Sequence, residues 1–204
     1  MSKLIECVPN ISEGLDLNKI NKIAKSVLNY EGVKLLNIDP GKATNRTVIT
    51  FVGPPETIVD AAYSLISKAK ELIDMRLHKG EHPRMGAVDV CPFIPISGVS
   101  MKETDDLAHQ LGNRVGSELL IPVYCYENAA KNKQRVNLAN CRSGEYEGLK
   151  NKLRDVKWKP DYGPNKFNET VAKFGAVAIG ARDFLVAYNI NLNTTSTRRA
   201  NSVA

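Results

Sequence analysis

Two of the three histidines of the chain lie four positions apart in a short polar stretch, HKGEHPRMGAVDV, at residues 78–90. The pattern His-x-x-Glu-His is that of an inverted zinc-protease motif, which needs a continuous helix to bring both imidazoles to one face. Gly80 lies between the histidines and Pro83 follows His82, and a proline disfavours helical geometry at the residue before it. No third ligand is evident nearby, so we expect no metal site here.

The same stretch could instead be a loop that carries a catalytic histidine. An imidazole titrates near neutral pH, so His82 could take up and release a proton during a reaction. Glu81 is the neighbouring carboxylate, and the planar guanidinium of Arg84 could hold a carboxylate of a substrate. The residue types alone suit a structural turn with a hydrogen-bonded histidine equally well. Both interpretations stay open at this point.

A second polar cluster, DPGKATNRT, occupies residues 39–47. It lacks the register of a phosphate-binding loop, because no G-x-x-x-x-G precedes Lys42. This cluster follows the predicted strand 33–38, and the histidine stretch 78–87 precedes the predicted strand 88–96. In a split βαβ sheet these two strand ends could face one cleft. Asp39, Asn45 and Arg46 are therefore candidate binding residues, and the alternative is a plain connecting loop.

The elements that would position these clusters follow from hydrophobic periodicity. Short apolar runs that end at turn residues predict strands, and apolar residues that recur every three or four positions predict amphipathic helices. The expected order is strand 4–8, helix 17–30, strands 33–38 and 47–52, helix 54–75 and strand 88–96. This βαββαβ order is the split pattern of a ferredoxin-like sheet, so we predict an α/β fold of the α+β type with helices on one side of the sheet. Further along we expect a helix at 101–120, a strand at 122–126, a partly helical stretch at 128–142, a loop at 163–175 and a strand at 176–178.

The domain organisation is expected to change near residue 178. We predict a first unit over residues 1–178 and the beginning of a second, truncated α/β unit over residues 179–204. Residues 184–192 have strand character, and Thr and Ser before Arg198 favour the start of a capped helix. The segment 163–175 is either a linker or a loop that lines a ligand, and its composition does not decide between the two.

The amino-acid composition narrows the class to which the protein can belong. The chain has 204 residues, 43% of them hydrophobic and 25% charged, which is typical of a globular protein. No apolar run approaches the ~20 residues of a membrane span and no secretory cleavage site is evident, so we expect a cytoplasmic protein without a membrane partner. The four cysteines form no C-x-x-C pair and suit reduced core thiols. The net charge of +6 is dispersed and aromatic residues make up 6%, so we expect a small polyanionic substrate and no nucleic acid.

Several long motifs resemble the glutamate formiminotransferase (glutamate formimidoyltransferase) family. They are ECVPNISEG, NRTVITFVGPPE, HKGEHPRMGAVDVCPFIPISGVS, SGEYEGL, PDYGP and GARDFLVAYNINLN, and together they extend along nearly the whole chain. The resemblance implies two α/β subdomains with a folate tunnel between or beside them. It also implies transfer of the formimino group from N-formimino-L-glutamate to N5 of tetrahydrofolate, in histidine degradation. The family's catalytic histidine falls in its G-E-H-P-R motif, which favours His82 as general base and acid.

The resemblance implies a ligand set as well. The folate-contacting segment of the family follows P-D-[FY]-G-P and begins here at Gly163, and the loop from there to Gly175 is longer than in the animal enzymes. The candidate substrate- and folate-binding residues are therefore Asp39, Asn45, Arg46, Glu81, Arg84, Gly163, Pro164 and Gly175. Tetrahydrofolate is expected as acceptor substrate, with no metal, and the protein as a homo-oligomer. The alternatives are a non-catalytic folate-binding or interaction module that retains only the first subdomain, and an unrelated basic binding module.

Overall fold

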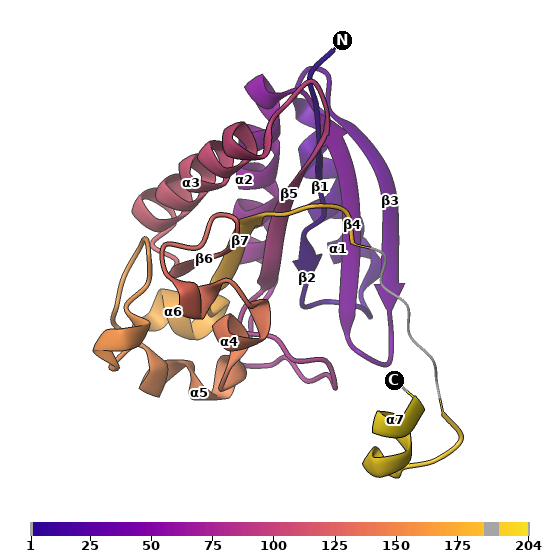
Figure 1. Cartoon of the computed structure of the whole chain (residues 1–204), viewed down its shortest axis with the longest axis vertical. Coiled ribbons are helices and arrows are strands. Elements are labelled where there is room, and N and C mark those ends of the chain that lie inside the picture. Colours follow the sequence, from indigo (N-terminus) through magenta and orange to yellow (C-terminus); the bar gives the residue numbers. More distant parts are fainter. Residues whose placement is uncertain (1, 186–191, 204) are drawn as a thin grey trace.

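A mixed sheet forms the centre of the computed structural model, which describes residues 2–185 and 192–203 (Figure 1). Its strands are β1 (Leu4–Cys7), β2 (Asn10–Ile11), β3 (Lys34–Gly41), β4 (Arg46–Gly53), β5 (Val88–Ser97), β6 (Val123–Glu127) and β7 (Val177–Ala181). The helices are α1 (Leu17–Lys25), α2 (Pro55–Leu72), α3 (Met101–Glu118), α4 (Leu138–Arg142), α5 (Glu145–Lys152), α6 (Glu169–Phe174) and α7 (Thr197–Val203). Single 3-10 turns lie at Ser26–Asn29, Lys133–Arg135 and Val156–Trp158. Among the helices of the described residues, none is long and apolar enough to cross a bilayer.

The first five strands have the ferredoxin-like arrangement that the sequence predicts. β1 and β2 follow one line between β4 and β5 and are antiparallel to both. β3 pairs with the outer side of β4 as an antiparallel hairpin. The predicted α+β fold class is therefore confirmed. The sheet then continues past β5, because β7 pairs with β5 in parallel and β6 pairs with β7 in parallel.

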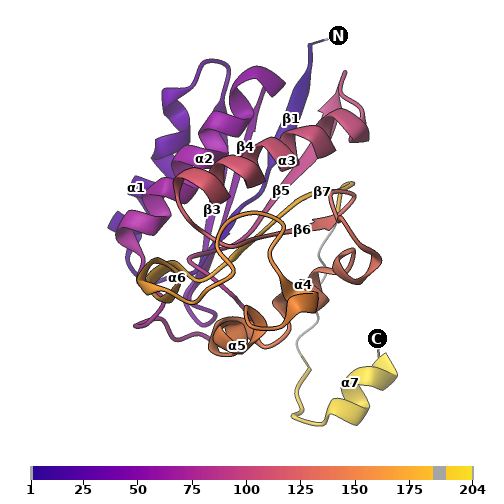
Figure 2. The ribbon, with the colours of Figure 1, turned by 90° about the vertical axis from the view of Figure 1, so that its left-hand side faces the viewer.

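Three long helices cover one face of the sheet. Figure 2 shows α1, α2 and α3 lying side by side against it. In β4, Ile49 and Phe51 point to these helices and are fully buried, whereas Val48 and Thr50 point to the other face and are half-buried. The helix starts are encoded locally: the Asp16 side chain caps α1, and Ser100 with Glu103 forms a capping box at α3.

In the part of the chain that the structure describes, helices cover only about half of the opposite face. The residues between β6 and β7 fold back over the β6–β7 half, where Tyr124, Tyr126, Cys141, Leu149 and Leu153 form a second buried cluster. The expectation of helices on one side alone is therefore wrong for this half. The physical reason is that β6 has buried apolar residues on both faces, Val123 and Cys125 on one and Tyr124 and Tyr126 on the other, so both faces need cover.

Three local expectations change in the structure. The predicted loop at 163–175 contains α6, which the Asn168 side chain caps and which buries Val171 and Phe174, three positions apart. The polar cluster at 39–47 is a tight hairpin, since β3 continues to Gly41 and β4 already begins at Arg46. The strand expected at 176–178 is longer, since β7 continues to Ala181, and the division into two units near residue 178 stays a prediction.

The C-terminal expectations have two outcomes. The strand expected at 184–192 is not formed at residues 184 and 185, and residues 186–191 lie outside the described residues. The expected helix start is present as α7, which has no buried residue.

Candidate active site

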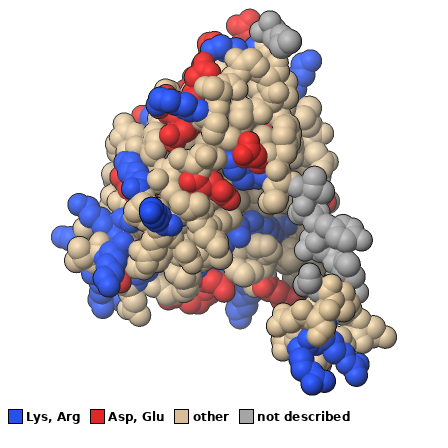
Figure 3. All heavy atoms as spheres, viewed as in Figure 1, with Lys and Arg blue, Asp and Glu red and all other residues tan. Residues whose placement is uncertain are grey.

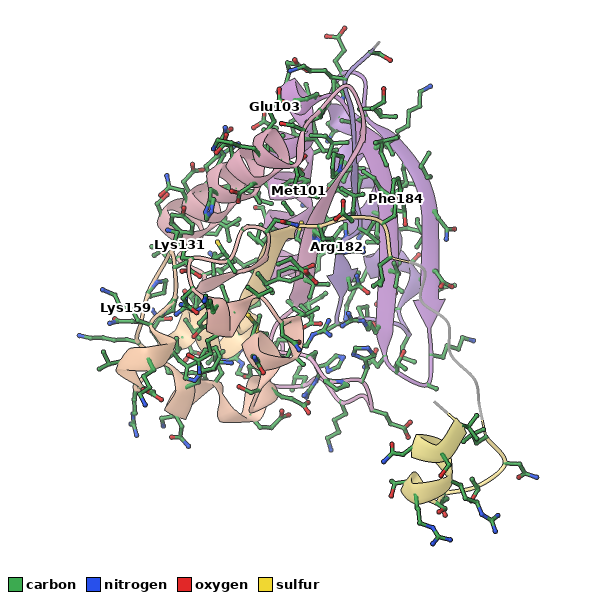
Figure 4. All side chains as sticks on the ribbon, viewed as in Figure 1. Met101, Glu103, Lys131, Lys159, Arg182 and Phe184 are labelled. Atoms are coloured by element: carbon green, nitrogen blue, oxygen red, sulfur yellow. The ribbon has the colours of Figure 1, made fainter. Side chains whose placement is uncertain are left out.

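The uncovered half of the sheet carries a pocket of about 540 Å³. Residues 182–185 leave β7 and cross this face, so that Arg182 and Phe184 lie over the sheet (Figure 4). The lining residues come from β2 to β6, from the β1–β2 and β3–β4 connections, from α4, from the histidine loop and from the crossing segment: Val8, Asn10, Asp39, Gly41, Thr44, Arg46, Val48, His82, Val90, Pro92, Tyr126, Glu127, Leu138, Arg142, Arg182 and Leu185. Figure 3 shows Lys and Arg side chains recessed near the middle of this face.

His82 lines this pocket, and among the described residues only its Nδ1 has a hydrogen-bond partner. Its Nδ1 lies 2.7 Å from the carbonyl oxygen of Pro83, which can only accept, so Nδ1–H donates and Nε2 keeps its lone pair. Burial lowers the pKa of the imidazole, and the positive charge of Arg46 lowers it further, while the bond to Pro83 raises it. His82 is therefore held in the neutral form that a general base needs near pH 7.

The loop that carries His82 is fixed at both ends. The buried guanidinium of Arg84 donates to both oxygens of Glu147, at 2.7 and 2.9 Å, and to Glu145 at 3.1 Å. Its Nε also donates to Nδ1 of His78 at 3.2 Å, and Nε2 of His78 donates to the carbonyl oxygen of Asn45 at 2.9 Å. The two histidines of the sequence motif thus have different surroundings, with His78 in a structural network and His82 at the pocket.

Asn45 ties the same loop to the β3–β4 hairpin. Its side-chain oxygen accepts from the backbone N–H of Gly14 at 2.8 Å, and its amide donates to the carbonyl oxygen of Lys79 at 2.8 Å. Asn45 has a φ of 47°, a left-handed conformation that asparagine tolerates better than most residues. The structure therefore places Asn45 and Arg84 in the support of the histidine loop.

Two arginines that line the pocket share one buried carboxylate. Oδ2 of Asp89 accepts from Nη1 of Arg46 at 2.7 Å and from Nη2 of Arg142 at 2.6 Å. Oδ1 of Asp89 accepts from the backbone N–H of Met85 at 3.1 Å, and Nε of Arg46 donates to Oδ1 of Asn10 at 3.2 Å. The Asp89 carboxylate is fully buried, so its ion pairs hold both guanidiniums in fixed positions beside His82.

The other predicted site residues lie in several places. Asp39 and Arg46 line the pocket together with His82, and Glu81 is exposed on the loop outside the lining. Gly163 and Pro164 lie between the 3-10 turn Val156–Trp158 and α6 and are not among the lining residues. Gly163 has a φ of 80° and packs against the carbonyl of Ile121.

Gly175 also lies outside the pocket lining. It forms a β-bridge with Gly86, where an added Cβ would overlap the carbonyl oxygen of Met85. Its place is thus at the end of the histidine loop, where it allows two backbones to approach closely.

Sequence reasoning missed several residues of the pocket. Arg142 and Glu127 come from segments that carry no motif, and Arg182 lies in the motif GARDFLVAYNINLN without having been singled out as a site residue; only the fold brings these three side chains to the sheet face. Asp89 did leave a signal, because a carboxylate inside the buried run VDVC needs a cationic partner. Among the described residues, no group of three or more His, Cys, Asp or Glu side chains could hold a metal ion.

The fold and the pocket define an α+β protein with a neutral histidine and paired arginines on an open sheet face. Residues 4–182 match the N-terminal subdomain of the formiminotransferase domain. The chain is 47% identical over 203 residues to a glutamate formimidoyltransferase of Thermoplasma acidophilum, and 42% identical over 204 residues to one of Streptococcus pyogenes serotype M1. It is also 50% identical over 192 residues to a formimidoyltransferase-cyclodeaminase of Dictyostelium discoideum. The chain therefore belongs to the formiminotransferase family, as its motifs predicted.

The matches cover this chain almost completely and the relatives only in part. They span 98% and 100% of the chain but 66% and 67% of the two glutamate formimidoyltransferases. The match with the Dictyostelium protein spans 94% of the chain and 35% of that relative. The chain thus corresponds to about two thirds of the shorter relatives and about one third of the longer one.

Proposed function

We propose that the protein is a glutamate formimidoyltransferase, which transfers the formimino group of N-formimino-L-glutamate to N5 of tetrahydrofolate. The observation that carries the proposal is His82, which lines the pocket with Nδ1 bound to the Pro83 carbonyl, while burial and two arginines favour its neutral form. The names of the relatives support the reaction type.

The residues suit the proton transfers of this reaction. N5 of tetrahydrofolate attacks the amidine carbon of the donor, and it must lose a proton as the new C–N bond forms. The bond from that carbon to the glutamate nitrogen then breaks, and the leaving amine must gain a proton. Nε2 of His82 can accept the first proton and return it in the second step, as one group serving as base and then acid. Positioned proton transfer of this kind contributes about 10²–10⁴-fold to a rate.

The charges around the pocket complement the proposed donor, which carries two carboxylates and an amidinium. Arg46, Arg142 and Arg182 offer positive charge, while Asp39 and Glu127 offer carboxylates that could face the amidinium. Glu127 has a φ of 53°, and non-glycine residues in this conformation cluster at functional sites. The volume of about 540 Å³ lies within the ordinary range of ligand pockets.

The proposal extends to the acceptor substrate, the compartment and the assembly of the protein. Tetrahydrofolate is the acceptor substrate, with Gly163, Pro164, Glu81 and Gly175 kept as candidate contacts on the strength of the family motif alone. The free state of all four buried cysteines fits a reducing compartment such as the cytoplasm. Homo-oligomerisation and a place in histidine degradation stay predictions.

The experiment measures formimino transfer in a chimera that has the length of the shorter relatives. Residues 1–204 replace the matching part of the Thermoplasma acidophilum protein, and tetrahydrofolate and N-formimino-L-glutamate are supplied. His82→Ala should lower kcat by about 10²–10⁴-fold, because the proton transfers lose their mediator. His78→Gln is the matched control, since it alters the other histidine of the motif, and it should lower kcat much less.

Two results would contradict the proposal. Unchanged turnover in the His82→Ala chimera would remove the histidine from the mechanism. Folate binding without any turnover by the unsubstituted chimera would favour the non-catalytic module instead.

A further inference from the structure

Among the described residues, the two guanidiniums on Asp89 have several N–H donors without a protein acceptor. Oδ2 of Asp89 has two lone pairs, and it uses them for Nη1 of Arg46 and Nη2 of Arg142. Within residues 2–185 and 192–203, the buried Nε–H of Arg142 has no hydrogen-bond partner. A buried donor without a partner is unfavourable, and it is found where a ligand, an ion or a water completes the hydrogen bonds.

The backbone around Arg142 is held so that its side chain stays in the pocket. Arg142 is the last residue of α4, and the buried ammonium of Lys152 donates to the carbonyl oxygens of Cys141, at 2.5 Å, and Ser143, at 3.1 Å, on either side of it. These bonds satisfy carbonyls at the C-terminal end of the helix, which would otherwise lack partners. The guanidinium, with 18% of the side chain exposed, is therefore preorganised rather than free to swing into solvent.

Charge at this place is not balanced by Asp89. One carboxylate faces two guanidiniums, so the group formed by Asp89, Arg46 and Arg142 has a net charge of one positive unit. A second carboxylate would balance it. A planar guanidinium can bind a carboxylate by donating two parallel N–H···O hydrogen bonds. Arg142 uses only its Nη2 for Asp89, so its Nε–H remains available for a second carboxylate.

We infer that Arg142, with Arg46 behind it, forms a carboxylate-binding subsite next to His82, which holds one carboxylate of the formimino donor. That a carboxylate binds here follows from the geometry of the two arginines and Asp89. That the carboxylate belongs to the donor rests on the proposed function. Arg142 is then a specificity-determining residue, because a donor without the carboxylate leaves its Nε–H unpaired.

The subsite also couples donor binding to the basicity of His82. The charged groups around the imidazole come from β3, β4, β5, β6, α4 and the crossing segment: Asp39, Arg46, Asp89, Glu127, Arg142 and Arg182. Arg46 and Arg142 both lower the pKa of His82. A carboxylate bound to them offsets their charge, so His82 becomes a stronger base when the donor is in place.

The test uses the 204-residue chain and glutarate, an unreactive dicarboxylate, with glutaramide as its neutral counterpart. Binding is measured by calorimetry at low salt, and the pKa of His82 by NMR titration with and without glutarate. Arg142→Gln should weaken glutarate binding by about 10- to 100-fold, the usual scale for a charge-assisted hydrogen bond. Arg142→Lys should weaken it less, because the charge stays while the fork is lost. Glutaramide should bind weakly to every variant.

The matched control is Arg154→Gln, which removes the same charge from an exposed position outside the pocket lining. It should leave glutarate affinity and the pKa of His82 unchanged. In Arg142→Gln the pKa of His82 should rise in the free protein, and glutarate should shift it less than in the unsubstituted chain. A purely structural role of Arg142 would not produce this pair of shifts. The Arg46–Asp89 pair remains in the variant, and the dispersion of its NMR spectrum checks folding.

The outcomes separate this inference from the proposed function. Equal glutarate affinity in Arg142→Gln and Arg154→Gln, or no glutarate binding by the unsubstituted chain, overturns the subsite even if the chimera transfers formimino groups. Arg142-dependent glutarate binding supports the subsite even if the chimera has no transferase activity, in which case only the identity of the donor is lost.

Discussion

Asp89→Asn removes the buried negative charge that the two arginines share and keeps the size of the side chain. The structure sets the expected magnitude, because the fully buried carboxylate pairs with Arg46 and Arg142, at 2.7 and 2.6 Å. Breaking a buried ion pair costs about 3–5 kcal/mol, since the partner charges are left buried and unpaired. The two arginine side chains are 10% and 18% exposed, so water reaches them in part. We therefore expect a loss near the lower end, about 3 kcal/mol in the free energy of unfolding.

Urea unfolding of the 204-residue chain, followed by the fluorescence of its single tryptophan, Trp158, measures this loss. With a slope of about 2 kcal/mol per molar urea, the midpoint should fall by about 1.5 M. Asp60→Asn is the matched control, because Asp60 forms the same kind of pair with Arg114 while the two side chains are 44% and 35% exposed. Exposed pairs contribute up to about 1 kcal/mol, so the control midpoint should fall by at most about 0.5 M.

Equal midpoint shifts for Asp89→Asn and Asp60→Asn would refute the reasoning, because burial would then not determine the cost of losing the charge. NMR provides an independent check. The Asp89 carboxylate raises the pKa of His82, so the asparagine variant should have a lower His82 pKa. An unchanged or higher pKa would contradict the electrostatic part of the argument.

Two further predictions concern stability. Gly163→Ala should lower the free energy of unfolding by about 1–3 kcal/mol, since its φ is 80° and a Cβ would overlap the carbonyl of Ile121. Gly148→Ala, with open space around the Cβ in α5, should instead raise it by up to about 1 kcal/mol; urea midpoints that rank the two variants the other way would contradict this. Burial lowers the pKa of Lys152 to about 8, so between that pH and the unfolded value of about 10.4 the unfolded chain binds more protons. The stability of the unsubstituted chain relative to Lys152→Met should therefore rise from about pH 8 to about pH 10.4, and a flat difference would show that the lysine does not titrate as the structure implies.

The sequence by itself determined the elements and the character of the histidine loop. Periodic apolar residues predicted α1, α2 and α3, and short apolar runs predicted β1, β3, β4 and β5, because helix and strand spacing are properties of neighbouring residues. The two-residue strand β2 was not predicted. Gly80 and Pro83 were enough to keep His78 and His82 off one helix, and the structure has the loop outside helix and strand. The family motifs predicted membership that the comparisons confirm.

Only the tertiary structure decided which charged groups meet. Arg84 stands two positions from His82 in the sequence, yet it turns to Glu145 and Glu147 on α5. Arg142 is 60 positions away and shares Asp89 with Arg46 beside the imidazole. Side-chain direction depends on strand register and on the path of a helix over the sheet, which are set by long-range packing rather than by local sequence. For the same reason, the addition of β6 and β7 to the split βαβ sheet, and with it the wall that carries Arg142, was not visible in the sequence.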